Sequence, residues 1–190
     1  MDGNVASPLR FPPPRSATRG KNRLETDCFV ALDFETADYD QDSACSLALV
    51  RVENHVITHR EHRLIRPPRR EFMFSYLHGI TWEQVAAEPT FAALWPLVRP
   101  LLDGARFIAA HNASFDANVM RACCRAAALP APETPYLCTV RLARKAWNIR
   151  PTKLPNVCAH LGLALKHHDA LSDAEACANI VLAAIRDQVF

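Results

Sequence analysis

Three apolar runs in the first third of the chain predict β-strands. Residues 28–32 are continuously apolar and end at Asp33, which is typical of a strand that is buried on both faces. Residues 44–52 predict a second strand, and the more polar residues 56–65 predict a third that lies nearer an edge of the sheet. Residues 53–54, Glu-Asn, are expected to form the tight hairpin turn between the second and third strands.

Helical periodicity dominates the middle of the chain. Thr81 and Gln84 have the spacing of a capping box and predict the start of a helix. Apolar residues then repeat at helical spacing over residues 91–102, where Pro96 predicts either a kink or a helix that begins at the proline. A short apolar strand is expected over residues 107–110. One face of the helix that follows is expected to consist of Phe115, Val119, Ala122, Cys123 and Ala126.

Three further helices are predicted in the last third of the chain. Thr139 is expected to cap a helix through Ala146, and Gly162 is placed to end the next helix. Ser172 and Glu175 have capping-box spacing, and apolar residues follow them at helical spacing to the end of the chain. There is no internal repeat and no sign of a second domain. This order of elements predicts an α/β layered domain with a mixed sheet.

The composition is that of an ordinary soluble globular protein. The 190 residues suit one domain, and 49% of them are hydrophobic and 22% charged. The apolar runs are too short to cross a bilayer, and the N-terminus lacks the continuous apolar stretch of a secretion signal, so we expect a cytoplasmic protein. The seven cysteines are odd in number and include no C-x-x-C pair, which predicts buried free thiols rather than a zinc site or disulfides.

Residues 1–23 differ from the rest of the chain. They are rich in proline and carry five basic side chains against one acid, Asp2, which predicts a disordered basic extension. The folded domain would then span residues 24–190, which carry 17 Lys and Arg against 19 Asp and Glu. The extension could add weak, salt-sensitive attraction to a polyanion.

Four carboxylates and one histidine lie in three short motifs. Asp33 and Glu35 end the first predicted strand, and Asp116 lies in the first turn of a predicted helix. His168 precedes the last helix, and Asp173 lies at its start. Acids so far apart in sequence converge only through the fold, and converging acids repel one another. A pair of divalent cations such as Mg²⁺ would offset this repulsion, because Mg²⁺ prefers oxygen ligands and binds substrate phosphates.

In this order, the three motifs resemble those of the DnaQ-like 3′–5′ exonucleases, the DEDD superfamily, in the subgroup that uses a histidine. The resemblance covers residues 27–187. It implies a ribonuclease H-like α/β fold, with a five-stranded mixed sheet flanked by helices. It also implies two Mg²⁺ or Mn²⁺ ions held by Asp33, Glu35, Asp116 and Asp173. His168 would be the general base. His167 is the rival base, but only His168 gives the H-x-A-x-x-D spacing of the family.

A second group of residues is expected to contact the substrate. The segment 78–81 resembles a family segment that packs against the terminal nucleotide, with Ile80 as a wedge at the last bases. Each apolar member could instead belong to the core, and for Phe115 the core is the favoured role. His111 is expected to be structural. The full set is Phe34, Thr36, His78, Ile80, Asn112 and Phe115.

The resemblance implies hydrolysis of phosphodiester bonds from the 3′ end of single-stranded or frayed DNA, which releases nucleoside 5′-monophosphates. Two alternatives stay open: a 3′–5′ exoribonuclease that trims RNA or short oligonucleotides, and a non-catalytic nucleic-acid-binding module on the same fold. The chain stops at Phe190, without the extension that the related polymerase subunit uses, which argues against stable association with a polymerase. Oligomeric state is not indicated by any of these patterns. Motifs of other enzyme classes, such as a phosphate-binding loop, are absent.

Overall fold

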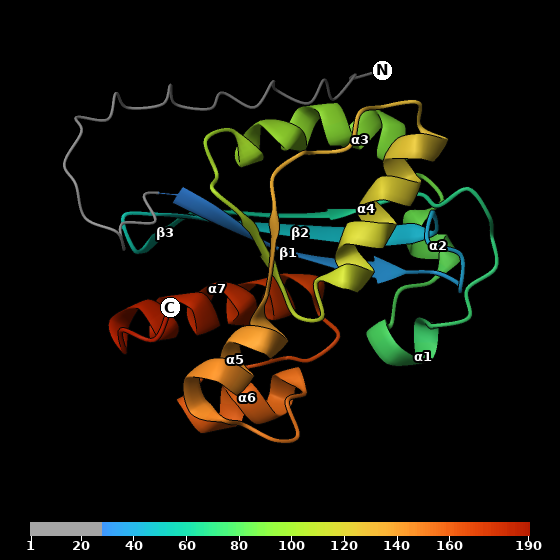
Figure 1. The fold of residues 1–190 in the computed structure, drawn as a ribbon. Coiled ribbons are helices and arrows are strands. Elements are labelled where there is room, and N and C mark those ends of the chain that lie inside the picture. Colours follow the sequence, from blue (N-terminus) through green and yellow to red (C-terminus); the bar gives the residue numbers. More distant parts are fainter. Residues whose placement is uncertain (1–27) are drawn as a thin grey trace, which may run out of the picture.

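The computed structural model describes residues 28–190, so the extension predicted at residues 1–23 lies outside the described residues. A five-stranded sheet forms its centre, with the strand order β3-β2-β1-β4-β5 (Figure 1). β1 pairs antiparallel with β2 and parallel with β4, so the predicted mixed sheet is confirmed and the polar third strand lies at an edge. The strands are β1 (Cys28–Thr36), β2 (Ala44–Glu53), β3 (Val56–Leu64), β4 (Ile108–Ala110) and β5 (Tyr136–Cys138).

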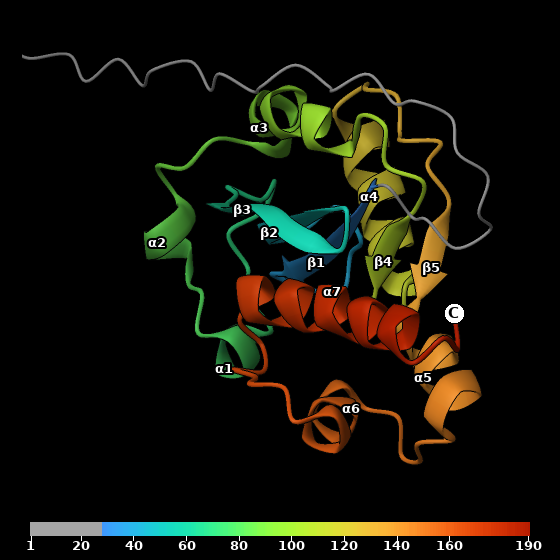
Figure 2. The ribbon, with the colours of Figure 1, turned by 90° about the vertical axis from the view of Figure 1, so that its left-hand side faces the viewer.

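Helices cover both faces of this sheet (Figures 1 and 2). One face carries α3 (Phe91–Val98), which continues into the 3₁₀ helix η1 (Arg99–Leu102), and α4 (Ser114–Ala126). The opposite face is crossed by the long helix α7 (Ala170–Arg186). On the same side lie α5 (Thr139–Trp147) and α6 (Leu154–Leu161). The short helices α1 (Ser75–His78) and α2 (Trp82–Val85) belong to the connection between β3 and α3.

Strand β1 contributes side chains to two apolar cores. Phe29 and Ala31 pack into the core beneath α7, whereas Val30, Leu32 and Phe34 pack into the core beneath α3 and α4. Successive side chains of a strand point to opposite faces, and both faces of this strand are covered. An apolar residue is therefore needed at every position, and the exposed fraction of residues 28–32 is only 0–7%.

The hairpin between β2 and β3 turns one residue later than predicted. β2 includes Glu53, and the turn consists of Asn54 and His55, with φ of 49° and 64°. A two-residue hairpin turn of this kind requires positive φ at both central positions. Asparagine tolerates that conformation better than glutamate, which explains why the turn begins at Asn54.

The middle helices confirm one predicted boundary, exclude one of two alternatives at Pro96 and correct the boundary at Thr139. Thr81 and Gln84 do form a capping box at the start of α2. Pro96 lies inside α3, which begins at Phe91, so no helix begins at the proline. Thr139 is the first residue of α5 rather than its cap, and its hydroxyl group donates to the carbonyl oxygen of Ala110 at 3.3 Å.

The end of α6 is confirmed, whereas the start of α7 is corrected. Gly162 ends α6 in the left-handed conformation, with φ of 67°. The cap of α7 is Asp169, three residues before the predicted Ser172, and the Asp169 carboxylate accepts a hydrogen bond from the Ser172 backbone N–H at 3.2 Å. The hydroxyl group of Ser172 accepts from the backbone N–H of Lys166 at 2.8 Å and so fastens the preceding loop.

The cysteines behave as predicted for buried thiols. No disulfide forms within residues 28–190, and six of the seven cysteines are buried, while Cys138 is partly exposed. A small polarisable side chain suits such interior positions. In the same part of the chain, no helix is both long and apolar enough to cross a membrane.

Candidate active site

Three segments that are distant in sequence meet at the carboxyl ends of β1 and β4. These neighbouring strands are parallel, with Ala31 opposite Ala109, so both chains leave the sheet at the same edge. β1 carries Asp33 and Glu35 at this end, and β4 leads into the first turn of α4, which holds Asp116. The first turn of α7 adds Asp173. Carboxyl ends of parallel strands are where open α/β sheets place their ligands.

Three of the four predicted acids form a tight group. One carboxylate oxygen each from Asp33, Glu35 and Asp173 lies within 4.8 Å of the others. Asp116 lies beside this group and is 1% exposed. Its carboxylate accepts a hydrogen bond from the backbone N–H of Phe34 at 3.2 Å, which ties the start of α4 to the end of β1.

These carboxyl groups destabilise one another when ionised. Burial raises the pKa of Asp33 well above its usual range, and the three neighbouring carboxylates raise it further. Burial and the Asp173 charge raise the pKa of Glu35 to about 7. Burial raises the pKa of Asp116 to about 8, although the backbone N–H of Phe34 acts in the opposite direction. Desolvation therefore outweighs the favourable position of Asp116 at a helix N-terminus.

The acidic group has the character of a site for divalent cations. Oδ1 of Asp173 is buried and has no hydrogen-bond partner among the described residues, although a buried carboxylate oxygen is rarely left without one. Burial raises the pKa of Asp173, while the two neighbouring histidines lower it. Hard cations with oxygen ligands would satisfy this atom and offset the repulsion. The residues present thus fit the pair of Mg²⁺ or Mn²⁺ ions that the sequence predicts.

Two adjacent histidines share the carboxylate of Asp173. Nδ1 of His167 lies 3.0 Å from Oδ2 of Asp173, and the backbone N–H of His168 donates to the same oxygen at 3.1 Å. The two imidazole rings stack, with centroids 3.9 Å apart. His168 has φ of 66°, which turns the chain between the two side chains. The predicted base and its rival therefore both lie at the acidic group, and either could join Asp173 in holding a cation.

Two of the predicted substrate contacts are buried instead. The side chain of Phe34 is 3% exposed and belongs to the core beneath α3 and α4, so its role is corrected from substrate contact to core. Thr36 is 6% exposed, and its carbonyl oxygen is 3.1 Å from Nε2 of His78. Alternation along β1 places residues 34 and 36 on the covered face, while Asp33 and Glu35 point to the other.

The segment around His78 is held against the acid-bearing strand. Nδ1 of His78 accepts a hydrogen bond from the Ile80 backbone N–H at 3.0 Å, so Nε2 carries the proton donated to Thr36. Burial lowers the pKa of His78, and the nearby His168 lowers it further. The structure therefore brings His78 and the partly buried Ile80 to the rim of the acidic group.

The start of α4 differs from its predicted face. Val119, Ala122 and Cys123 of the predicted face are buried, whereas Ala126 is exposed and Phe115 is 41% exposed. Asp116, Ala117 and Met120 are buried as well, so the buried face is rotated away from Phe115. The favoured core role of Phe115 was wrong, and its exposed ring is free for a ligand. Asn112, with φ of 66°, lies in the turn before α4 and accepts a hydrogen bond from the Ser114 hydroxyl group at 3.3 Å.

His111 has the structural role that was predicted. Its Nδ1 lies 2.9 Å from the Thr139 hydroxyl group, and its Nε2 lies 3.0 Å from the Thr152 carbonyl oxygen. Burial lowers the pKa of His111. Both ring nitrogens are therefore occupied by partners that join β4 to the segments around α5.

The fold is that of the ribonuclease H-like exonucleases. A family model described as an exonuclease of the RNase T type matches residues 30–181. This chain belongs to that family of DnaQ-like 3′–5′ exonucleases.

Two bacterial relatives define the similarity in sequence. The PolC-type DNA polymerase III of Thermotoga petrophila is 32% identical over 163 residues, which are 84% of this chain but only 12% of that protein. DNA polymerase III subunit epsilon of Aquifex aeolicus is 26% identical over 185 residues, which are 93% of this chain and 89% of that protein. The chain therefore matches a small part of one relative and most of the other.

Two solved structures define the similarity in fold. Exonuclease X in complex with 5′-overhanging duplex DNA superposes with a TM-score of 0.65 and 25% identity, over 84% of this chain and 92% of that one. A 3′-exonuclease that recognises the histone mRNA stem-loop superposes with a TM-score of 0.74 and 18% identity, over 86% of this chain and 65% of that one. The second likeness shows the fold alone.

Proposed function

We propose that the protein is a metal-dependent 3′–5′ exonuclease that hydrolyses phosphodiester bonds from the 3′ end of single-stranded or frayed DNA and releases nucleoside 5′-monophosphates. The single observation that supports this proposal best is the group of buried carboxylates at the carboxyl ends of β1 and β4. One oxygen of Asp173 in this group has no hydrogen-bond partner within residues 28–190, and the carboxyl groups of Asp33, Glu35 and Asp116 have strongly raised pKa values.

The four acids would hold two Mg²⁺ or Mn²⁺ ions. Asp33, Glu35 and Asp173 would provide the shared ligand oxygens, and Asp116 would contribute directly or through a water molecule. When bound, the two cations supply activation of the attacking water and stabilisation of the leaving 3′ oxygen. The backbone N–H of Phe34 orients the Asp116 carboxylate, and the His168 backbone N–H orients Asp173.

His168 would accept the proton of the attacking water. Burial lowers the pKa of His168, so its imidazole is neutral and able to accept a proton near pH 7. His167 would instead position Asp173, since its Nδ1 lies 3.0 Å from the Asp173 carboxylate. His78 would position the rim segment, and Ile80, Phe115 and Asn112 would contact the terminal nucleotides.

DNA is the favoured substrate class, and RNA is the second candidate. The two relatives described above are named as a PolC-type DNA polymerase III and as a DNA polymerase III subunit, and the structure of Exonuclease X contains DNA. The histone mRNA 3′-exonuclease shares the fold, which motivates a direct test of RNA. Discrimination between the two would depend on contacts to the 2′-OH group.

The test is digestion of matched 5′-labelled DNA, RNA and dinucleotide substrates with Mg²⁺ or Mn²⁺. We expect a ladder of products shortened from the 3′ end, release of nucleoside 5′-monophosphates, and loss of both in EDTA. The Asp33→Asn variant should produce no ladder, whereas Asp103→Asn, at an exposed ion pair with Arg99, should match the wild type. Metal-independent binding without cleavage would show that the domain is a non-catalytic nucleic-acid-binding module.

A further inference from the structure

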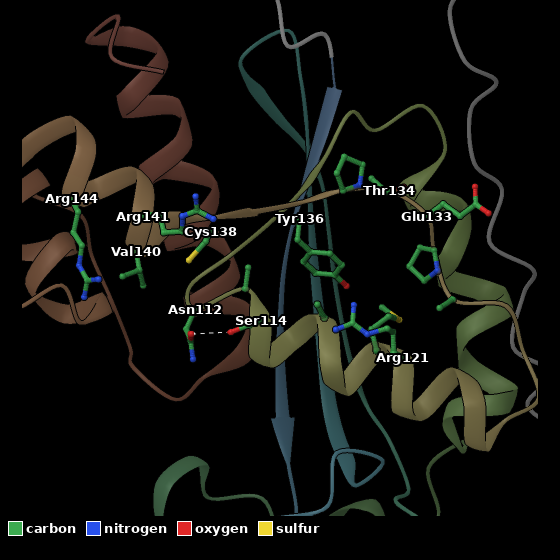
Figure 3. Close-up of a pocket in the computed structure, with 16 residues that line it drawn as sticks. Asn112, Ser114, Arg121, Glu133, Thr134, Tyr136, Cys138, Val140, Arg141 and Arg144 are labelled. Atoms are coloured by element: carbon green, nitrogen blue, oxygen red, sulfur yellow. Dashed lines mark hydrogen bonds between the residues drawn. The ribbon is translucent and has the colours of Figure 1, made fainter.

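A cavity of about 650 Å³ lies between α4 and the segment that forms β5 and the start of α5. Figure 3 shows Arg121 on the wall formed by α4, and Arg141 and Arg144 on the wall formed by α5. Tyr136 of β5 lies between the two walls. Cavities of 300–1,000 Å³ are typical of ligand sites. We call this cavity the arginine groove.

None of the three arginines of the groove forms an ion pair with a described residue. Arg121 contacts the amide oxygen of Asn118, Arg144 donates to the Thr152 hydroxyl group at 2.9 Å, and Arg141 makes no hydrogen bond within residues 28–190. Elsewhere among the described residues, arginines do form ion pairs with carboxylates: these are Arg51, Arg60, Arg63, Arg69, Arg99 and Arg186. Glu133 is the single acid that lines the groove, so its lining carries an excess of positive charge.

The hydroxyl group of Tyr136 lacks a partner. This oxygen is buried and makes no hydrogen bond with any described residue. Figure 3 shows it directed toward the side of the groove that carries Arg121. Burial raises the pKa of Tyr136, so the group keeps its proton and is a hydrogen-bond donor that needs an acceptor. A phosphate oxygen has that property.

The groove adjoins the acidic group without sharing its acids. Asn112 and Ser114 line the groove. Asn112 lies in the turn before α4, and Ser114 is the first residue of α4, two residues before Asp116. None of the four acids and neither His167 nor His168 lines the groove. The Asp116 charge nevertheless acts on Tyr136, as does that of Arg121. The charges of the acidic group and of the groove thus both reach the Tyr136 side chain.

We infer that the arginine groove binds the phosphate backbone of the substrate strand on the 5′ side of the nucleotide being removed, with Arg121, Arg141 and the Tyr136 hydroxyl group as donors to phosphate oxygens. This inference rests on the proposed function. Exposed guanidinium groups without carboxylate partners suit phosphates, which they bind through paired hydrogen bonds. The contacts are independent of base identity, as expected for an enzyme that removes successive nucleotides of any sequence.

Substrate length distinguishes the groove from the acidic group. The single phosphodiester bond of a dinucleotide would be held at the acidic group, so this substrate offers no further phosphate to the groove, whereas a strand of about 12 nucleotides does. We expect Arg121→Ala and Arg141→Ala each to raise the KM for the long strand about tenfold, and to raise the ratio of the long-strand KM to the dinucleotide KM. Arg141→Lys should recover part of the loss, because the charge remains. The matched control is Arg60→Ala, on β3 at the opposite edge of the sheet.

The salt dependence of binding and the Tyr136→Phe variant provide two further tests. Each phosphate contact to a single strand contributes about 0.7 to the slope of log affinity against log salt, so each arginine variant should lose about that amount. Tyr136→Phe removes a buried polar group without a partner, which should raise Tm slightly. If the hydroxyl group also donates to phosphate, the same variant should bind the long strand several-fold more weakly. A raised Tm with unchanged affinity would remove Tyr136 from the proposal.

Binding without cleavage separates this inference from the proposed function. Fluorescence anisotropy of a labelled single strand in EDTA measures binding without the metal ions, even if no hydrolysis is ever observed, and comparison of the variants isolates the contribution of the groove. Weaker binding by Arg121→Ala and Arg141→Ala, but not by Arg60→Ala, supports the groove. Equal affinity of all three variants, or KM changes that are the same for dinucleotide and long strand, would overturn it.

Discussion

Helix α4 separates two regions of opposite charge and opposite energetic character. Its first turn carries Asp116 into the acidic group, where burial of like charges raises the carboxyl pKa values. Five residues later, Arg121 belongs to the arginine groove, whose cations are exposed and form no ion pair with a described carboxylate. Buried like charges oppose folding, whereas exposed charges are screened by solvent and cost little.

This difference indicates how function and stability are divided between the two regions. The acidic group holds strain that bound cations would relieve, so its substitutions should change activity and stability in opposite directions. The exposed arginines of the groove cause no such repulsion, so their substitution should change binding with little change in stability.

The largest expected effect comes from Asp33→Asn. Because Asp33 faces all the other carboxylates, its loss should lower kcat on the order of 10³-fold or more. At a pH where the carboxyl groups are ionised, the same change removes a repulsive charge, so the metal-free protein should then melt at a higher temperature, by about 2–4 °C for each kcal/mol of repulsion removed. Activity assays with Mg²⁺ and calorimetry in EDTA check the two parts. A metal-free Tm below that of the wild type would contradict the proposed strain.

The two histidines should differ in the size of their effect. His168→Ala should lower kcat about 10²–10³-fold if His168 accepts the proton of the water. His167→Ala should lower activity about tenfold, because it removes a group that orients Asp173 rather than the base. The pH–rate profile is the sharper readout. If the acidic limb of the profile is lost in His167→Ala but kept in His168→Ala, then His167 is the base and His168 is the group that orients Asp173.

Phe34 donates its backbone N–H to the Asp116 carboxylate, and Phe115 precedes Asp116 in the sequence. Substitutions of these two phenylalanines should nevertheless change different properties. Phe34 is 3% exposed, so Phe34→Ala should lower the free energy of unfolding by about 3–5 kcal/mol. Phe115 is 41% exposed, so Phe115→Ala should change stability by less than about 0.5 kcal/mol while raising KM. Denaturant unfolding and steady-state kinetics on the same two variants test this. A strongly destabilised Phe115→Ala would restore the core role first predicted for that ring.

The strands and the acids were predictable because both depend on short-range patterns. The apolar run of residues 28–32 has one physical explanation, a strand covered on both faces, and the acids that follow it mark the end of that strand. The order of the acid motifs along the chain also matches a known family. Neither inference needed knowledge of how helices are rotated against the sheet.

Rotation and local turn geometry could not be predicted in the same way. Phe115 fits the apolar stripe of α4 by spacing, but the helix turns Asp116 and Met120 inward instead. Ser172 and Glu175 have the right spacing for a cap, but Asp169 satisfies the first N–H groups earlier. In each case two residues could occupy the same structural position, on the buried face of α4 or at the cap of α7, and tertiary packing determines which one does.

The arginine groove was not predicted at all. Arg121, Tyr136 and Arg141 come from α4, β5 and α5, and no periodicity joins them. The cationic spacing of Arg141 and Arg144 on one helix was the available signal. This spacing alone is equally typical of a solvated helix face, so only the structure shows that α4 forms the opposite wall of the groove.

The smallest expected effect is the pH dependence of stability in the metal-free protein. The raised carboxyl pKa values, about 7 for Glu35 and about 8 for Asp116, exceed those of the unfolded chain, which lie near 4. Between these limits the folded protein holds more protons than the unfolded one, so stability falls as pH rises. The buried histidines, such as His111, have lowered pKa values and act in the opposite direction, but their contribution is complete above about pH 7.

The informative window is therefore pH 7 to 8.5. There we expect the free energy of unfolding in EDTA to fall by about 1–3 kcal/mol, and saturating Mn²⁺ to stabilise more at pH 8 than at pH 7, because bound cations favour the ionised carboxylates. Asp33→Asn should reduce this pH dependence of the free energy of unfolding. Arg141→Ala should leave it unchanged, because the Arg141 side chain lies in the groove and not among the acids. A metal-free stability that rises across this window would mean that the carboxyl groups ionise without mutual cost, and the contrast between the two sides of α4 would disappear.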